Sequence, residues 1–283
     1  MRILVTGVSG QLGYDVNKEL HRRNEHIVLA VDIDELDITN KEEVDLIVGG
    51  FRPDIIMHHA AYTAVDKAED DFGNCYKVNI VGTEHLLDIA RKLNSKFLYI
   101  STDYVFDGTK EGLYESDDTK NPQSVYGKSK DESEKIVINY NKSFIVRISW
   151  AFGLNGNNFV KTMLKLGKTK DKISVVNDQF GSPTYTADLA ILLCDMIETE
   201  KYGVYHATNE GYCTWYDFAN KIFEYSKINI NVIPCKSSMY PTKAKRPTNS
   251  RLSKESLDLK GFNRLPHWQD ALKRYLKELE EIA

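Results

Sequence analysis

A glycine-rich turn directly after the first apolar run constrains the fold of this chain more than any other feature. Residues 2–6 read RILVT, and the segment TGVSGQLG that follows places glycines at positions 7, 10 and 13. Residues 11–23 then show helical periodicity, so the turn joins a strand to a helix. Glycines let a backbone approach a pyrophosphate closely, and a helix start offers it free N–H groups. Gly7, Gly10 and Gly13 therefore predict a dinucleotide-binding loop.

The first half of the chain alternates short β-branched runs with longer periodic stretches, which is typical of βαβ units. The strand runs are mostly apolar throughout, as expected for a parallel sheet that is covered on both faces. We therefore predict an α/β fold, a Rossmann-like doubly wound parallel sheet with a smaller C-terminal substrate-binding lobe. The pattern predicts strands at 2–6, 26–32, 54–59, 96–102 and 143–149, and helices at 11–23, 41–49, 75–92 and 126–139.

The regular alternation ends at Trp150, where the Gly/Asn-rich segment FGLNGNN begins two residues later. No repeat and no Ser/Pro-rich linker separates two independent modules. We expect residues 1–150 to form the dinucleotide-binding domain, rejoined by part of 173–205, and residues 151–283 to form mainly the substrate lobe. Within 151–283 the pattern predicts helices at 159–166, 187–198, from about 214 and from 267, and strands at 172–176 and 204–208.

Composition narrows the class of function. The chain has 283 residues, 42% of them hydrophobic, which is enough to bury a sizeable core. Its 37 basic and 41 acidic residues give a net charge of -4, so no global attraction to nucleic acid or a membrane surface is expected. A small-molecule substrate is the default expectation.

The cysteines and the apolar runs bear on cellular location. Cysteines at 75, 194, 213 and 235 lack metal-site or disulfide-framework spacing, so we predict reduced packing residues. No apolar run approaches about 18 residues, and no secretory h-region is visible at the start. We expect a cytoplasmic protein.

Asp32 ends the second predicted strand, where a carboxylate can accept hydrogen bonds from the adenosine ribose hydroxyls of a dinucleotide. This placement favours NAD, and no Lys or Arg lies directly beside it. Asp32 alone does not exclude NADP, so NADH and NADPH both stay open as cofactors. Asp34 and Asp37 could instead cap local turns.

Tyr126 and Lys130 lie four residues apart, on one face of a predicted helix, and Thr102 ends the fourth predicted strand. An isolated Y-x-x-x-K is usually an ordinary surface pair. Reduction of a ketone, however, places negative charge on oxygen and needs a positioned acid. Bringing a phenol pKa from about 10 toward neutrality takes roughly 4 kcal/mol, much of which a nearby ammonium can supply. Tyr126 is therefore the candidate acid.

The glycine loop, Thr102 and Y-x-x-x-K occur in the order that is typical of the extended short-chain dehydrogenase/reductase superfamily, which this chain resembles. Within it, the chain is most similar to the dTDP-4-dehydrorhamnose reductase family. That resemblance implies NAD(P)H-dependent reduction of the C4 ketone of dTDP-4-dehydro-L-rhamnose to dTDP-L-rhamnose, in nucleotide-sugar and polysaccharide biosynthesis. It rests on LDIT (36–39), AAYTAVDKAE (60–69), STDYVFDG (101–108), NPQSVYGKSK (121–130), DQFGSPT (178–184) and RPTNSRL (246–252).

The resemblance also implies roles for individual residues. Thr102 would hold the substrate carbonyl, and Lys130 would also bond the nicotinamide ribose. Gln179 and Arg246 would contact the diphosphate, since a guanidinium suits a phosphate. Further cofactor contacts implied are Gln11, Leu12, Asp37, Ile38, Ala60, Ala61, Tyr62 and Asn79, and further substrate contacts are Val65, Asp103, Tyr104 and Trp150.

Some features depart from the family pattern. The common T-S-W-[VL]-Y-G is ISWAFG here, residues 148–153, which removes a phenolic hydroxyl expected near the pocket. A different nucleotide-linked 4-keto-6-deoxy sugar is therefore an alternative substrate. A second alternative is a non-catalytic regulatory subunit of a methionine adenosyltransferase, as in a related branch, although a subunit needs no proton donor.

The resemblance also bears on oligomeric state and metal binding. Some family members pair through metal-bound acidic residues, and Asp15 is the only position that could be suggested here, although we interpret it first as part of a solvated helix face. We predict no metal, and a homodimer is possible by analogy. The histidines at 58 and 59 are interpreted as packing groups.

Overall fold

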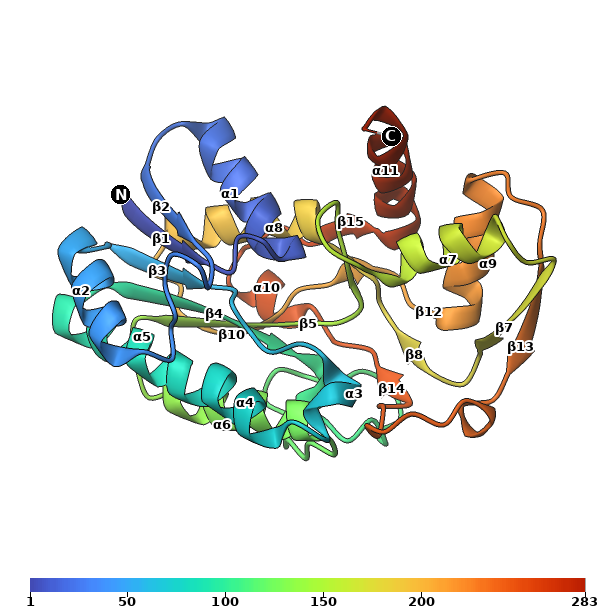
Figure 1. The fold of residues 1–283 in the computed structure, drawn as a ribbon, viewed down its shortest axis with the longest axis horizontal. Helices are drawn as coiled ribbons and strands as arrows, with labels where there is room; N and C mark the ends of the chain where they lie inside the picture. The colour runs from blue at the N-terminus through green and yellow to red at the C-terminus, as the bar shows by residue number, and fades with distance from the viewer. Residues whose placement is uncertain (283) are drawn as a thin grey trace.

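The computed structural model describes residues 1–282, which fold around a six-stranded parallel sheet (Figure 1). Its strand order is β10-β5-β4-β3-β1-β2, so the chain reverses direction across the sheet between β1 and β3. Ligands of such sheets bind outside the carboxyl ends of the strands at that reversal. The predicted α/β fold with a doubly wound sheet is confirmed. The strands are β1 (Arg2–Thr6), β2 (Ile27–Val31), β3 (Ile55–His58), β4 (Lys96–Thr102), β5 (Ser143–Ile148) and β10 (Gly203–His206).

Helices cover both faces of this sheet, as Figure 1 shows. Helices α1 (Gln11–Arg23) and α8 (Thr186–Ile197) pack on one face. Helices α2 (Lys41–Phe51), α5 (Gly82–Leu93) and α6 (Val125–Val137) cover the other. Each layer encloses its own cluster of fully buried aliphatic and aromatic side chains, which explains why the strands are apolar on both faces.

The helix starts are encoded locally. Asn40 accepts the backbone N–H groups of Glu42 and Glu43 and so caps α2. Thr214 and Asp217 form a capping box at the start of α9 (Trp215–Tyr225), which places that helix where the sequence predicted it.

The C-terminal part has its own core between α7 (Phe159–Gly167), α9 and α11 (Trp268–Glu281). Short strands connect these helices in small sheets of two or three strands. They are β6 (Ala151–Phe152), β7 (Lys172–Val176), β8 (Phe180–Gly181), β9 (Thr184–Tyr185), β11 (Asn209–Glu210), β12 (Cys213–Thr214), β13 (Asn231–Cys235), β14 (Asn249–Ser250) and β15 (Leu265–His267), with α10 (Glu255–Leu259) between the last two.

Some predicted elements differ from the structure. The single helix expected at 75–92 is α4 (Phe72–Tyr76), a π-helical turn (Lys77–Val81) and α5 in succession. Strand β7 pairs with β13 rather than joining the main sheet. The sequence did not predict β13, because Pro234 lacks a backbone donor and argues against a strand interior.

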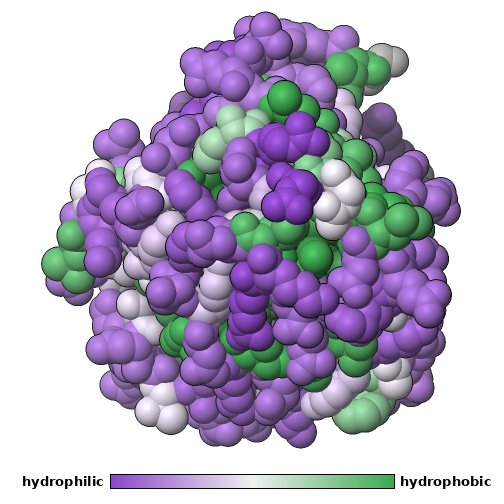
Figure 2. All heavy atoms as spheres, turned by 90° about the vertical axis from the view of Figure 1, so that its left-hand side faces the viewer, coloured by the Kyte–Doolittle hydropathy of each residue, from purple (hydrophilic) through white to green (hydrophobic). Residues whose placement is uncertain are grey.

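The surface near α2 and the N-terminus is mostly hydrophilic, broken by small apolar patches (Figure 2). None of the helices in residues 1–282 has the length and apolar character needed to cross a bilayer. All four cysteines are free and buried, as predicted.

Candidate active site

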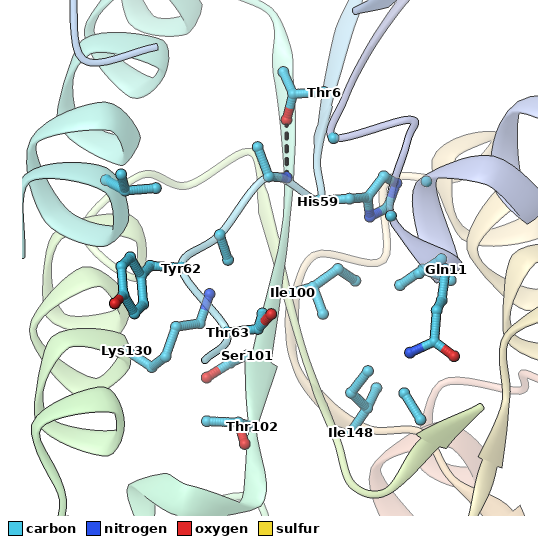
Figure 3. Close-up of a pocket in the computed structure, with 18 of the residues that line it drawn as sticks. Thr6, Gln11, His59, Tyr62, Thr63, Ile100, Ser101, Thr102, Lys130 and Ile148 are labelled. Atoms are coloured by element: carbon cyan, nitrogen blue, oxygen red, sulfur yellow. Dashed lines mark hydrogen bonds between the residues drawn. The ribbon is translucent and has the colours of Figure 1, made fainter. Parts of the chain in front are cut away.

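A cavity of about 700 Å³ opens at the carboxyl ends of the parallel strands, where the strand order reverses (Figure 3). Its wall contains the glycine loop, the ends of β2 to β5 and the first turns of α6. Most of the predicted site residues meet here. They are Gly7, Gly10, Gln11, Leu12, Gly13, Asp32, Asp37, Ile38, Ala60, Ala61, Tyr62, Val65, Thr102, Asp103, Tyr104, Tyr126, Lys130 and Trp150.

The glycine loop has the close-packed backbone that a pyrophosphate cradle needs. Gly7 has φ +73°, and a Cβ on Gly13 would lie 2.1 Å from the carbonyl oxygen of Gly7. No side chain caps the start of α1, and its first turn carries no acidic residue. The N–H groups and positive dipole end of α1 are therefore available to an anion.

The loop is held to the C-terminal part by amide side chains. Gln11 Oε1 accepts the N–H of Gly153 at 2.9 Å and the side-chain amide of Asn158 at 3.0 Å. Asn155 donates to the carbonyl oxygen of Ser9 at 2.7 Å. The segment FGLNGNN thus fixes the geometry of the glycine loop from the other side.

The two predicted ribose-side carboxylates differ in their bonding. Asp32 Oδ2 accepts the N–H of Ser9 at 2.8 Å, which joins the end of β2 to the glycine loop. Asp37 accepts both the N–H and the hydroxyl of Thr39, which lowers the pKa of its carboxyl. Asp37 therefore caps its own turn, as the sequence allowed, while it also lines the cavity.

The loop after β3 forms the floor between the two ends of the cavity. The backbone N–H of Ala60 donates to the Thr6 hydroxyl at 3.2 Å, the bond drawn in Figure 3. His59 also lines the cavity, and neither of its buried ring nitrogens has a hydrogen-bond partner in the described residues. Burial lowers the pKa of His59 to about 3, so its imidazole is neutral.

Helix α6 is positioned at both ends. The Ser124 hydroxyl accepts the N–H of Gly127 at 3.1 Å, and a Cβ on Gly127 would lie 2.3 Å from the Tyr104 carbonyl oxygen. Further along the helix, the buried Glu134 accepts two hydrogen bonds of 2.8 Å from Arg147 of β5. This bidentate pair, of the kind that loses about 3–5 kcal/mol when one partner is removed, fixes α6 against the sheet.

Tyr126 and Lys130 both lie in the cavity wall. Burial raises the pKa of the Tyr126 phenol above its usual range, and the neighbouring Thr102 hydroxyl opposes that rise. Burial lowers the pKa of Lys130 to about 7, and its Nζ lies 4.0 Å from the centre of the Tyr99 ring. Figure 3 shows Lys130 reaching from α6 into the space between Tyr62 and Thr102.

Thr102 is connected to a segment far along the chain. Its hydroxyl donates to Asp103 Oδ1 at 3.0 Å, and the hydroxyl of Ser250 donates to Asp103 Oδ2. The N–H of Tyr104 donates to Thr102 Oγ1 at 3.2 Å. Burial raises the pKa of Asp103 to about 6, against the opposing effect of these donors.

Asn79 lies behind the wall rather than in it. Its Oδ1 accepts the N–H of Tyr62 at 2.8 Å, and its Nδ2 donates to the Ser129 hydroxyl at 2.8 Å. Asn79 therefore ties the loop after β3 to α6, next to Tyr126. The π-helical turn that carries it is a geometry common at functional sites.

The substrate-side candidates divide into two groups. Trp150 lines the cavity at φ +49° and stacks on Trp215, with ring centroids 3.7 Å apart. Gln179 and Arg246 lie outside the wall of this cavity. Arg246 instead donates to Asp66 Oδ2 of α3 (Val65–Ala68) at 2.6 Å. The segment that carries Arg246 therefore contacts the short helix that follows β3 in the chain.

The structure differs from the expectations for Phe152 and Asp15. The phenolic hydroxyl absent at Phe152 was expected near the pocket, but Phe152 is 1% exposed and stacks on Tyr185 in the C-terminal core, so this expectation was wrong. Asp15 was interpreted as part of a solvated helix face, and this was wrong, because its carboxylate is buried and accepts the hydroxyl of Thr186. In residues 1–282 no group of three or more His, Cys, Asp or Glu side chains is arranged to hold a metal ion.

Sequence reasoning missed three residues that organise this site. Ser9 fixes Asp32, Ser250 bonds Asp103, and Asp66 pairs with Arg246. Ser250 and Asp66 occur within RPTNSRL and AAYTAVDKAE, so the matched motifs carried them without indicating their partners.

Comparisons with known proteins agree with this geometry. Residues 1–281 match the family described as the RmlD substrate binding domain. A dTDP-4-dehydrorhamnose reductase from Aggregatibacter actinomycetemcomitans is 46% identical over 287 residues, covering 96% of this chain and 97% of that protein. A crystal structure of a dTDP-4-dehydrorhamnose reductase from Clostridium acetobutylicum superimposes with a TM-score of 0.96 at 42% identity, covering 99% and 100% of the two chains. A dTDP-4-dehydrorhamnose reductase from Bacillus anthracis, solved in complex with NADP, has a TM-score of 0.95 at 42% identity and coverages of 98% and 99%.

Proposed function

Because this chain belongs to the family of the RmlD substrate binding domain, whose relatives are dTDP-4-dehydrorhamnose reductases, we propose that it reduces dTDP-4-dehydro-L-rhamnose to dTDP-L-rhamnose with NADH or NADPH. One observation carries the proposal beyond the family. Thr102, Tyr126 and Lys130 line the same cavity as the glycine loop. A proton donor and a dinucleotide cradle thus share one enclosed space.

The cofactor fits the residues present. The glycine loop admits no side chain at Gly13, and the uncapped start of α1 offers N–H groups to a pyrophosphate. Asp32 would hold the adenosine ribose, and Lys130 and Tyr126 the nicotinamide ribose. The reduced nicotinamide supplies the hydride that the C4 carbon of the sugar accepts.

Residues of this chain supply the proton that reduction of the ketone requires. Tyr126 donates its phenolic proton to the C4 oxygen as negative charge develops there. The Lys130 ammonium stabilises the resulting phenolate, which offsets the rise that burial imposes on the pKa of Tyr126. Thr102 would hold the carbonyl oxygen beside Tyr126 by turning its hydroxyl proton, which Asp103 accepts in the protein without substrate, to that oxygen. Trp150, stacked on Trp215, gives the sugar ring a flat apolar wall.

The test is a cofactor-oxidation assay. Purified protein receives dTDP-4-dehydro-L-rhamnose and reduced cofactor, and the absorbance of the reduced nicotinamide is followed. We expect oxidation with the parent protein and a fall in kcat of about 10²–10⁴-fold in Tyr126→Phe, with cofactor binding little changed. Equal turnover in the two proteins would remove the assignment of Tyr126 as the acid.

The alternatives give different results in this assay and in a pulldown. A reductase of another nucleotide-linked 4-keto-6-deoxy sugar would oxidise the cofactor only with that sugar. A regulatory subunit would show no turnover and would bind a methionine adenosyltransferase in equal proportion. The homodimer and the cytoplasmic location stay predictions, which sedimentation and cell fractionation measure.

A further inference from the structure

The segment between β13 and β14 is anchored at both of its ends. At one end the backbone N–H of Ser237 donates to Asp178 Oδ1 at 2.9 Å. At the other end the hydroxyl of Thr248 donates to the carbonyl oxygen of Gly108 at 2.7 Å. We call residues 238–247, which lie between these anchors, the strap. The strap runs from the C-terminal part to the side of α3 (Figure 1), so its middle depends on the contacts it makes there.

Helix α3 and the turn after it hold the middle of the strap by two carboxylates. Asp66 accepts the guanidinium of Arg246 at 2.6 Å and the backbone N–H of Ala244 at 3.1 Å. Asp70, just after α3, pairs with the ammonium of Lys243. Ala244 is fully buried, whereas both members of the Lys243–Asp70 pair are more than half exposed. Exposed ion pairs contribute little to stability and are weakened by salt, so the docked strap is held weakly enough to lift.

The same short helix also holds the start of α6. Glu69 Oε1 accepts the backbone N–H of Val125 at 2.8 Å. Val125 is the first residue of α6, whose opening N–H groups have no acceptor within the helix, and Tyr126 follows it directly. From the strap itself, Lys245 donates to Gln123 Oε1 at 3.2 Å, two residues before α6 begins. Glu69 therefore fixes the turn of backbone that carries the proposed acid.

The strap and the proposed acid also meet at the cavity wall, through Tyr104. Burial raises the pKa of the Tyr104 phenol to about 12, and the neighbouring Arg246 guanidinium opposes that rise. The Tyr104 ring packs edge-on against the Tyr126 ring, with centroids 5.7 Å apart. Val65 and Tyr104 both line the cavity, so the strap docks at its rim. The docked strap therefore borders the space in which Tyr126 would act.

We propose that α3 couples docking of the strap to the placement of Tyr126, with Glu69 as a positioning residue for the proton transfer. Asp66 and Glu69 are one helical turn apart, so a strap held by Asp66 also fixes Glu69 against the first turn of α6. When the strap lifts to admit a ligand, α3 loosens and Val125 loses its acceptor. The phenol is then aligned only while the strap is docked, which commits a bound ligand to reaction. The inference deepens the proposed function and rests on it for the reaction.

The decisive measurement is hydrogen exchange of the Val125 amide, followed by mass spectrometry without any substrate. Asp66→Ala removes both bonds to the strap, so we expect it to speed this exchange by roughly tenfold. Tryptic cleavage after Lys243 should rise by a similar factor, because that bond leads into the buried Ala244 and is cut only when the strap lifts. The matched control is Lys67→Ala, an exposed position on the same helix, which should change both rates by less than about twofold.

Turnover separates Glu69 from a residue that only supports the fold. Glu69→Ala should lower kcat by about fivefold to tenfold and leave the KM for the reduced cofactor unchanged. Glu69→Gln still accepts the N–H of Val125, so it should restore most of the lost kcat. Adding Glu69→Ala to Asp66→Ala should lower kcat little further, because the two changes break the same connection.

Three results would overturn the proposal. The first is an Asp66→Ala protein that resists trypsin like the parent, since α3 would then not hold the strap. The second is an Asp66→Ala protein whose cleavage rises while Val125 exchanges at the parental rate, since the strap would then lift without disturbing α6. The third is an equal loss of kcat in Glu69→Gln and Glu69→Ala, or additive losses in the double variant. A parent protein without turnover would remove the proposed function, while exchange and cleavage would still decide the coupling.

Discussion

The hydroxyl of Thr102 donates to the carboxylate of its chain neighbour Asp103, with 3.0 Å between Oγ1 and Oδ1. A hydroxyl has one proton. While Asp103 accepts it, the lone pairs of Thr102 are left to accept the N–H of Tyr104. Asp103, predicted as a substrate contact, therefore also orients the Thr102 hydroxyl.

This relationship predicts a pH effect on turnover. Burial raises the pKa of Asp103 to about 6 in the free enzyme, so kcat/KM should fall as the pH drops below 6 and the carboxylate that orients Thr102 is protonated. Asp103→Asn should lower kcat/KM by roughly tenfold and should lose this acidic limb. The measurement is kcat/KM against pH from 5 to 9.

Ser250→Ala provides the matched comparison for Asp103. The Ser250 hydroxyl donates to Asp103 and lowers its pKa, so removing this hydroxyl should move the acidic limb to higher pH without abolishing it. An unchanged limb in both variants would show that another group titrates there.

The lowered pKa of Lys130 predicts a loss of kcat/KM at alkaline pH. Its pKa is lowered to about 7 by burial, so in the free enzyme its ammonium is lost as the pH rises above 7. The value of kcat/KM for the reduced cofactor should then fall by about tenfold per pH unit, because that ratio reports the free enzyme. Lys130→Met should be nearly inactive at every pH. Lys128→Met, on an exposed position of the same helix, should keep the parental profile.

The raised pKa of Asp15 predicts an effect on the free energy of unfolding rather than on the reaction rate. Burial raises its pKa to about 6, above the value near 3.9 of an unfolded chain. A raised acid pKa contributes stability below pH 4, and this contribution is lost as the pH rises through 6. Asp15→Asn, which still accepts the Thr186 hydroxyl, should therefore stabilise the protein at pH 8 by about 1–3 kcal/mol and not at pH 4.

Urea unfolding at both pH values measures this difference. Asp117→Asn, which removes an exposed loop carboxylate, should change the free energy of unfolding little at either pH. A destabilised Asp15→Asn at pH 8 would mean that the ionised carboxylate is needed by the fold.

The sequence predicted the elements whose causes are local. The bounds of β1, β4 and α1 agree to the residue, because their apolar periodicity and flanking turns are complete within the segment. The Tyr126 and Lys130 pair was likewise visible from helix spacing. These features need no information about the rest of the chain.

Features that depend on distant partners were not predictable in this way. The π-helical turn around Asn79 depends on bonds to Tyr62 and Ser129, and the orientation of Thr102 depends on Ser250 through Asp103. Phe152 was misplaced because ISWAFG gives no sign of which side chains turn away from the cavity. Each of these required the contacts of the folded chain.

Strand β10 has a consequence for how the chain can be made and cut. It forms the edge of the main sheet beside β5, although its residues, Gly203–His206, come more than 50 positions later than those of β5. A ribosome that has released only residues 1–150 has produced the whole glycine loop, yet the edge of β5 and the apolar face that α8 covers are open to water. A truncation at 150 should therefore aggregate rather than yield a nucleotide-binding module, and holdase chaperones are expected to engage the nascent chain at this stage.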